Sequence, residues 1–82
     1  ENSFELSLFP NPVNETLTIQ ISDSKMYEIS IYDLQGRVVL EKQIFSNLNT
    51  LSTSAWNNGI YQVKITDFEG KSINKALVKI SK

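Results

Sequence analysis

Carboxylates are the side chains of this sequence best suited to catalysis, because the chain contains no histidine and no cysteine. It therefore lacks the commonest general base, a thiol nucleophile and the usual zinc ligands. Nine aspartates and glutamates remain, and two acids facing each other across a cleft would suffice for glycoside hydrolysis. A chain of 82 residues has room for one modest core and little concave surface. We expect no catalytic residue, no cofactor and no enzyme activity.

Several acids lie in expected turns, where carboxylate oxygens could bind calcium. They are Asp23, Asp33, Asp67 and Glu69. No segment has the dense acidic spacing of a calcium loop. Two of the turns match in character, Asp33-Leu34-Gln35-Gly36-Arg37 and Asp67-Phe68-Glu69-Gly70-Lys71. Aspartate at the start of a turn and glycine near its end are ordinary hairpin chemistry. We expect two similar turns rather than a metal site or an internal duplication.

Aromatic side chains allow two interpretations. Trp56, with Tyr27, Tyr32 and Tyr61, could form a platform on which sugar rings stack. Tyr27 and Tyr61 lie on expected inward faces, however, and Trp56 could close one end of the core. Burial preference favours packing. The alternative, a carbohydrate-binding or immunoglobulin-like accessory module of a secreted hydrolase, stays open.

Charge is unevenly distributed along the chain, although the formal net charge is only −1. This balance argues against binding to nucleic acid or to an anionic membrane. After Glu69 the chain carries only basic charges, at Lys71, Lys75, Lys79 and Lys82. The spacing places Lys71, Lys75 and Lys79 on one face of a final strand. That face suits an anionic or polar receptor, or protects an exposed edge strand from pairing with other chains.

Hydrophobic residues alternate with polar ones in short runs, which is typical of half-buried strands. Turn-forming residues separate the runs, and no window shows a helical period. The expected strands span residues 4–8, 16–22, 27–32, 37–45, 49–53, 59–66 and 71–80. The sequence therefore predicts one all-β domain over residues 1–82, an immunoglobulin-like antiparallel β-sandwich of about seven strands.

Two details of register follow from this pattern. Pro10 and Pro12 cannot donate to a strand ladder, so they should end the first strand in a stiff, extended crossing segment. In the strand 37–45, we expect Val38, Leu40 and Ile44 to share one face.

Five segments in fixed order carry a resemblance to a known family. They are Phe9-Pro10-Asn11-Pro12-Val13, Leu17-Thr18-Ile19, the run from Ile29 to Val39, Gly59-Ile60-Tyr61-Gln62-Val63-Lys64-Ile65, and the closing stretch from Lys75 to Lys82. Together they resemble the C-terminal sorting domain of type IX secretion cargo (type A, the Por secretion tail) of Bacteroidetes-type bacteria. The resemblance covers nearly the whole chain.

The resemblance implies which residues form the sorting signal. Pro10, Asn11 and Pro12 match the first family motif, and Gly59 and Tyr61 match the second. The terminal signal region corresponds to residues 75–82, whose lysines are Lys75, Lys79 and Lys82. Deleting the last few residues should then abolish export while barely changing the melting temperature.

The resemblance also implies a role and partners. The domain would be a non-enzymatic tag following a cargo domain in a larger secreted protein. An outer-membrane type IX translocon and its shuttle protein would recognise it. A sortase-like peptidase would usually remove it and attach the cargo to surface lipopolysaccharide, so that the cargo is secreted or reaches the cell surface through the periplasm. An exposed edge strand would also allow weak dimerisation.

Overall fold

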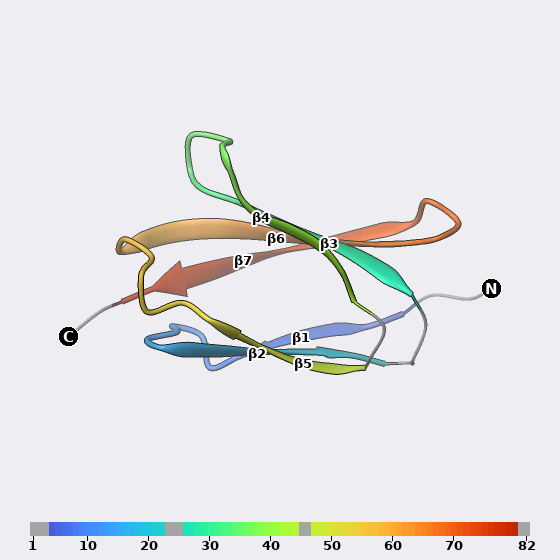
Figure 1. Ribbon diagram of the computed structural model, residues 1–82, viewed down its shortest axis with the longest axis horizontal. Helices are drawn as coiled ribbons and strands as arrows, with labels where there is room; N and C mark the ends of the chain where they lie inside the picture. Colours follow the sequence, from blue (N-terminus) through green and yellow to red (C-terminus); the bar gives the residue numbers. More distant parts are fainter. Residues whose placement is uncertain (1–3, 23–25, 45–46, 81–82) are drawn as a thin grey trace.

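Two antiparallel sheets packed face to face form the molecule (Figure 1). The computed structural model describes residues 4–22, 26–44 and 47–80. One sheet has the order β1-β2-β5 and comprises β1 (Leu6–Phe9), β2 (Thr16–Ile21) and β5 (Leu48–Ser52). The other has the order β4-β3-β6-β7 and comprises β4 (Val38–Ile44), β3 (Tyr27–Tyr32), β6 (Gly59–Asp67) and β7 (Ser72–Lys79). The predicted all-β sandwich of about seven strands is confirmed. Across these residues, no helix is long and apolar enough to span a membrane.

The core lies between the sheets and follows the alternation of the sequence. In β6, for example, Tyr61, Val63 and Ile65 are buried, whereas Gln62 between them is exposed. The Phe4 and Tyr27 rings close one end of the core, with centroids 4.9 Å apart. The buried apolar residues are Phe4, Leu6, Val13, Leu17, Ile19, Ile21, Tyr27, Ile29, Ile31, Ile44, Tyr61, Val63, Ile65 and Leu77. The period-two pattern therefore identified the faces of most strands.

The register of β4 differs from the prediction at its start. Leu40 lies opposite Ile31, but the next pair is Val38 with Tyr32, so Val39 is an extra residue. Such a bulge shifts the alternation by one position. Leu40 and Ile44 face inward as expected, whereas Val38 is 52 % exposed. The expectation that Val38 shares their face is wrong, because a bulge leaves no mark in a simple alternating pattern.

The two matching turns adopt the same hydrogen-bonded conformation. One Asp33 carboxylate oxygen accepts hydrogen bonds from the backbone N–H groups of Gln35 and Arg37, at 3.0 and 2.9 Å. Asp67 does the same for Glu69 and Lys71, at 3.0 and 2.9 Å. Because the backbone N–H of Arg37 favours the ionised form, it lowers the pKa of the Asp33 carboxyl. These aspartates serve turn formation, as predicted.

Candidate functional site

The segment between β1 and β2 leaves its own sheet and joins the edge of the other. Val13 forms a parallel bridge with Lys79 of β7. Its N–H donates to the Val78 carbonyl at 2.8 Å, and its carbonyl accepts from the Ile80 N–H at 2.9 Å. These bonds cover the end of an otherwise open edge strand. A weak edge-to-edge dimer through the remaining part of that edge stays a prediction.

Asn11 extends this pairing with its side chain. Its Oδ1 accepts a hydrogen bond from the Val78 N–H at 3.0 Å, and its Nδ2 donates to the Ala76 carbonyl at 3.3 Å. The side-chain amide therefore occupies the place of a peptide group in the ladder. Pro10 and Pro12 on either side are exposed, and both of their peptide bonds are cis. The segment bends at these residues and is not extended as predicted, because the chain must reach β7 and return to its own sheet within a few residues.

Replacing Asn11 by alanine should therefore loosen the crossing segment from β7. Two exposed hydrogen bonds are lost, and each contributes about 0.5–1.5 kcal/mol, so we expect a loss of about 1–3 kcal/mol. Urea denaturation would measure it. Asn74→Ala, on the exposed side of β7, is the matched control and should change the free energy of unfolding by less than about 0.5 kcal/mol. Equal effects of the two substitutions would contradict the ladder role of Asn11.

Lys79 is buried, which corrects the expectation of an accessible lysine face. Lys75 and Lys79 do share a face of β7, but it is the face that continues from the buried Leu77. Only 1 % of Lys79 is exposed, and its Nζ donates a hydrogen bond to the Asn14 carbonyl. Thr53, fully buried, donates its hydroxyl to the same carbonyl at 3.1 Å. A partner cannot contact Lys79 in the folded domain.

The three lysines of the last strand region differ in exposure, because the crossing segment covers only the end of the edge strand β7. Lys71 and Lys75 lie where the sandwich is open to solvent, and both are exposed. Lys79 lies beneath the crossing segment, which covers it. Lys75 can therefore protect the edge strand from pairing with other chains, whereas the buried Lys79 cannot. Lys82 lies outside the described residues.

Gly59 and Tyr61 shape the loop that precedes β6. Gly59 lies opposite Lys79 and has a φ of 153°, which L side chains rarely adopt. The Tyr61 hydroxyl donates to the Asn57 carbonyl at 2.6 Å. Its ring packs on Trp56, with centroids 4.8 Å apart, and Trp56 is half-buried against the core. The packing interpretation of these aromatic residues is therefore confirmed.

Most of the predicted signal residues meet at one end of the sandwich. The blue crossing segment, the yellow loop before β6 and the end of β7 lie together on the left of Figure 1. Pro10, Asn11 and Pro12 belong to the crossing segment, and Lys79 ends β7. Gly59 and Tyr61 lie at the start of β6, directly after the loop. Lys75 lies farther back along β7, opposite Val63. Neither the Asn14 carbonyl nor the Thr53 hydroxyl could be found from the sequence, because the contacts of a backbone carbonyl have no residue signature.

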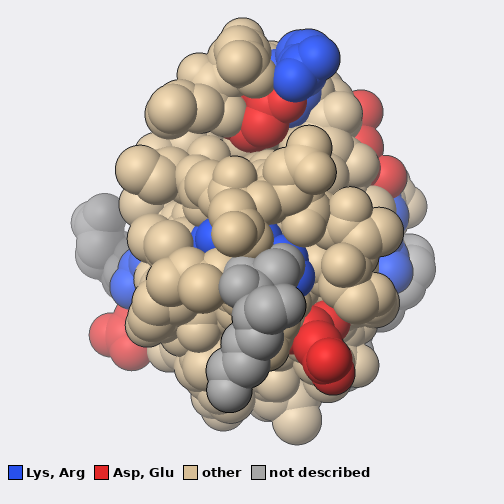
Figure 2. All heavy atoms as spheres, turned by 90° about the vertical axis from the view of Figure 1, so that its left-hand side faces the viewer, with Lys and Arg blue, Asp and Glu red and all other residues tan. Residues whose placement is uncertain are grey.

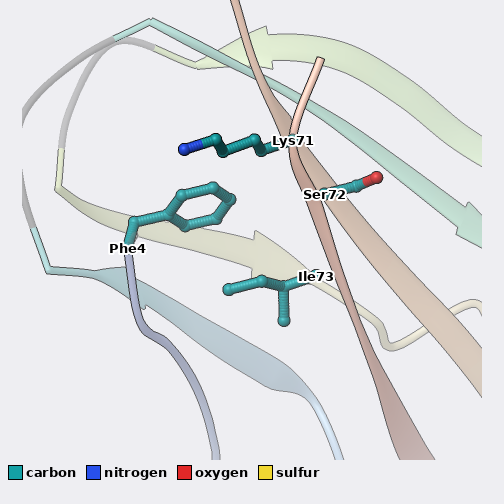
Figure 3. A pocket seen from close by; sticks show the side chains of 4 residues that line it. All are labelled: Phe4, Lys71, Ser72 and Ile73. Atoms are coloured by element: carbon teal, nitrogen blue, oxygen red, sulfur yellow. The ribbon is translucent and has the colours of Figure 1, made fainter. Parts of the chain in front are cut away.

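The surface hollows offer little catalytic chemistry. One hollow at the other end of the sandwich is lined by Phe4, Lys71, Ser72 and Ile73. Lys71 and Ile73 extend toward the Phe4 ring, whereas Ser72 points away (Figure 3). The Ser72 hydroxyl is thus directed away from the Lys71 ammonium and the Phe4 ring. Within residues 4–22, 26–44 and 47–80, no three acidic, histidine or cysteine side chains cluster as a metal site would require.

A family model described as the secretion system C-terminal sorting domain matches residues 7–79. The chain belongs to this family. The match includes the crossing segment, the loop before β6 and β7 up to Lys79. The domain is therefore a C-terminal sorting domain, and the resemblance found in its motifs is confirmed.

Relatives in known proteins agree with this assignment. The chain is 30 % identical over 74 residues to a beta-agarase D of Zobellia galactanivorans and 21 % identical over 75 residues to an endo-acting ulvan lyase of Formosa agariphila. Each alignment covers 90 % of this chain but only 15 % and 14 % of those proteins. The sorting domain thus spans about one seventh of the curated relatives that it matches.

Solved structures confirm the immunoglobulin-like fold. A DUF3244 family protein from Bacteroides vulgatus, described as an immunoglobulin-like β-sandwich, superposes with a TM-score of 0.79 at 22 % identity, covering 92 % of this chain and 83 % of that one. PorZ of Porphyromonas gingivalis, a surface component of the type IX secretion system, gives 0.75 at 20 % identity, covering 92 % and 11 %.

Proposed function

We propose that this domain directs an attached cargo through the outer-membrane translocon of a type IX secretion system, to the cell surface or beyond. The family match over residues 7–79 carries this proposal. The meeting of the motif residues at one end of the sandwich supports it, because a partner could then recognise segments distant in sequence as one surface. The cargo domain would precede this one in the full protein.

The domain acts as an address without chemistry of its own. Its motif residues form backbone ladders, loop contacts and core packing rather than a cleft. The translocon with its shuttle protein would bind the folded domain. A sortase-like peptidase would then remove it and attach the cargo to lipopolysaccharide.

A fusion experiment tests the proposal. Residues 1–82 are placed after a periplasm-directed fluorescent protein in a host of the Bacteroidetes type, with and without a working type IX translocon. We expect fluorescence outside the cell only when the translocon works. A fusion without the domain is the control and should stay in the periplasm. Retention of the complete, folded fusion would refute the proposal.

Trp56 tests the alternative of a carbohydrate-binding module. Because the indole packs on Tyr61 and the core, Trp56→Ala should cost about 2–4 kcal/mol of folding free energy. It should not change binding to polysaccharides, which we expect to be undetectable in pull-down assays with agarose and other insoluble glycans. Polysaccharide binding by the unaltered domain, lost in a folded Trp56 variant, would favour the alternative.

A further inference from the structure

The crossing segment covers only the second half of the edge strand β7. It pairs with backbone groups of Ala76, Val78 and Ile80. In an antiparallel ladder, the N–H and C=O groups of alternate residues point to the same side of the strand. Those of Ser72 and Asn74 therefore also point away from β6. Within residues 4–22, 26–44 and 47–80, no group forms a hydrogen bond with these outward backbone groups.

The uncovered half of β7 is accessible and regular. Leu77 and Lys79 are buried, whereas the residues at positions 72 and 74–76 are exposed. The pairing of β7 with β6 shows no register shift. In contrast, β4 at the other edge of the same sheet contains the bulge at Val39, and a bulge interrupts edge pairing. Residues 72–76, the open half of β7, are therefore the better template for an added strand.

The side chains along this open half alternate between basic and apolar. Lys71, Ile73 and Lys75 share the face that continues to the buried Leu77. Lys71 and Ile73 border the hollow that also contains the Phe4 ring (Figure 3). Lys75 is exposed, and no acidic side chain of the described ranges forms an ion pair with it. A strand added here would meet a basic, an apolar and a basic side chain in turn.

Charge distinguishes the open half of β7 from the covered end of the sandwich. Figure 2 views the covered end and shows basic groups near its centre, with acidic groups around them, among mostly uncharged residues. Such a mixture does not select a partner by its net charge. Lys71 and Lys75, the charged side chains directly before and within the open half, are both basic. The open half therefore favours an acidic partner.

We propose that the open half of β7 binds an extended segment of a partner protein as an additional strand. Backbone hydrogen bonds to Ser72 and Asn74 provide affinity, as in other cases of strand addition. Side chains on the inner face provide specificity, with an apolar one opposite Ile73 and acidic ones opposite Lys71 and Lys75. The segment thus has the pattern acidic-x-apolar-x-acidic. This inference goes beyond the proposed function and does not depend on it.

Lys75 acts differently on different partners. A basic strand is repelled by its ammonium, so the lysine protects the edge from such strands. A second copy of β7 is disfavoured in the same way, because it brings its own lysines at the same spacing. An acidic segment instead gains cross-strand ion pairs. Edge protection and selective strand addition are therefore compatible.

Two peptides of opposite charge test the pattern. One has glutamate, valine and glutamate at alternate positions between threonines, and the other has lysines in place of the glutamates. We expect the domain to bind the glutamate peptide with a Kd of about 1 mM or below, and the lysine peptide at least about fivefold more weakly. Lys75→Glu should reverse this preference. Lys42→Glu, at an exposed lysine on the inner face of β4, is the matched control and should leave the preference unchanged.

Hydrogen exchange locates the added strand. Saturating glutamate peptide should slow exchange of the Asn74 amide at least about tenfold and leave the β4 amides unchanged. Asn74→Pro removes this outward donor at an edge, where proline is tolerated, and should weaken binding at least about fivefold. Melting temperatures report whether the variants fold, and the charge exchange at Lys75 stays decisive if the proline variant does not.

Three results would overturn the inference. The first is that neither peptide binds, or that Lys75→Glu leaves the peptide preference unchanged. The second is that the peptide protects the β4 amides in place of the Asn74 amide. The third is that protection of Asn74 rises with the concentration of the domain alone, which would assign this edge to a second copy.

Discussion

Ending the chain at Leu77 should unfold the domain and not merely remove its signal. The truncation deletes residues 78–82, among them Val78, Lys79 and Ile80. Val78 and Ile80 form backbone hydrogen bonds with Val13, and the Val78 N–H also donates to the Asn11 side chain. Lys79 is fully buried and donates a hydrogen bond to the Asn14 carbonyl. The pairs of Ile60 with Val78 and of Gly59 with Lys79 are lost too.

The expected loss is comparable with the total stability of so small a domain. At about 0.05–0.15 kcal/mol per residue, the free energy of unfolding of 82 residues is about 4–12 kcal/mol. Three lost backbone or amide hydrogen bonds at about 1 kcal/mol each, with the loss of the buried Lys79 side chain at about 2–4 kcal/mol, remove most of it. Far-ultraviolet circular dichroism should show loss of the strand signal at 37 °C.

A shorter truncation provides the control. Ending the chain at Ile80 keeps every contact named above, so the melting temperature should stay within about 3 °C. Export of this variant tests whether Lys82 belongs to the signal. The expectation that deleting the last few residues barely affects folding therefore applies only beyond Ile80. A cooperative melting transition near that of the complete domain, in the variant ending at Leu77, would contradict the anchoring role of β7.

The sequence predicted the strands and the sandwich, because alternation reports burial directly. Leu17, Ile19 and Ile21 illustrate this, since all three are buried as their spacing requires. The phase of β4 was missed at Val38, because the extra residue at Val39 is defined only against Tyr32 of the neighbouring strand. The alternation of apolar and polar residues is a property of one strand, whereas a bulge exists only in the pairing of two strands.

The candidate site, too, could be predicted from the sequence only in part. The motif residues were found from their pattern, and the structure brings six of the eight together at one end. Lys79 was expected to be accessible, because a lysine on a strand is rarely fully buried. Its hydrogen-bond acceptor is the carbonyl of Asn14, 65 residues earlier, which no local pattern indicates. Only the crossing of one segment onto β7 makes that position buried.

Lys79→Ala should be the most damaging single substitution among the lysines of β7. Removing a fully buried side chain leaves a cavity, so we expect a loss of about 2–4 kcal/mol. For a domain of this size the melting temperature falls by about 4–8 °C per kcal/mol. Lys75→Ala, on the same face but exposed, is the matched control and should cost less than about 0.5 kcal/mol. Equal melting temperatures of the two variants would contradict the burial of Lys79.

The substitution Lys79→Met distinguishes the contribution of side-chain packing from that of the Lys79 hydrogen bond. Methionine refills most of the space and removes the cost of burying an ammonium group, so global stability should change by less than about 1 kcal/mol. The Asn14 carbonyl keeps its bond from Thr53 but loses the one from Lys79. A hydrogen bond from a charged group contributes about 1.5–3 kcal/mol. The population in which the crossing segment is detached from β7 should therefore rise at least about tenfold. Hydrogen exchange at the Val13 and Ile80 amides would measure this opening. Unchanged exchange at both amides would show that packing alone, and not the ammonium, holds the segment on β7.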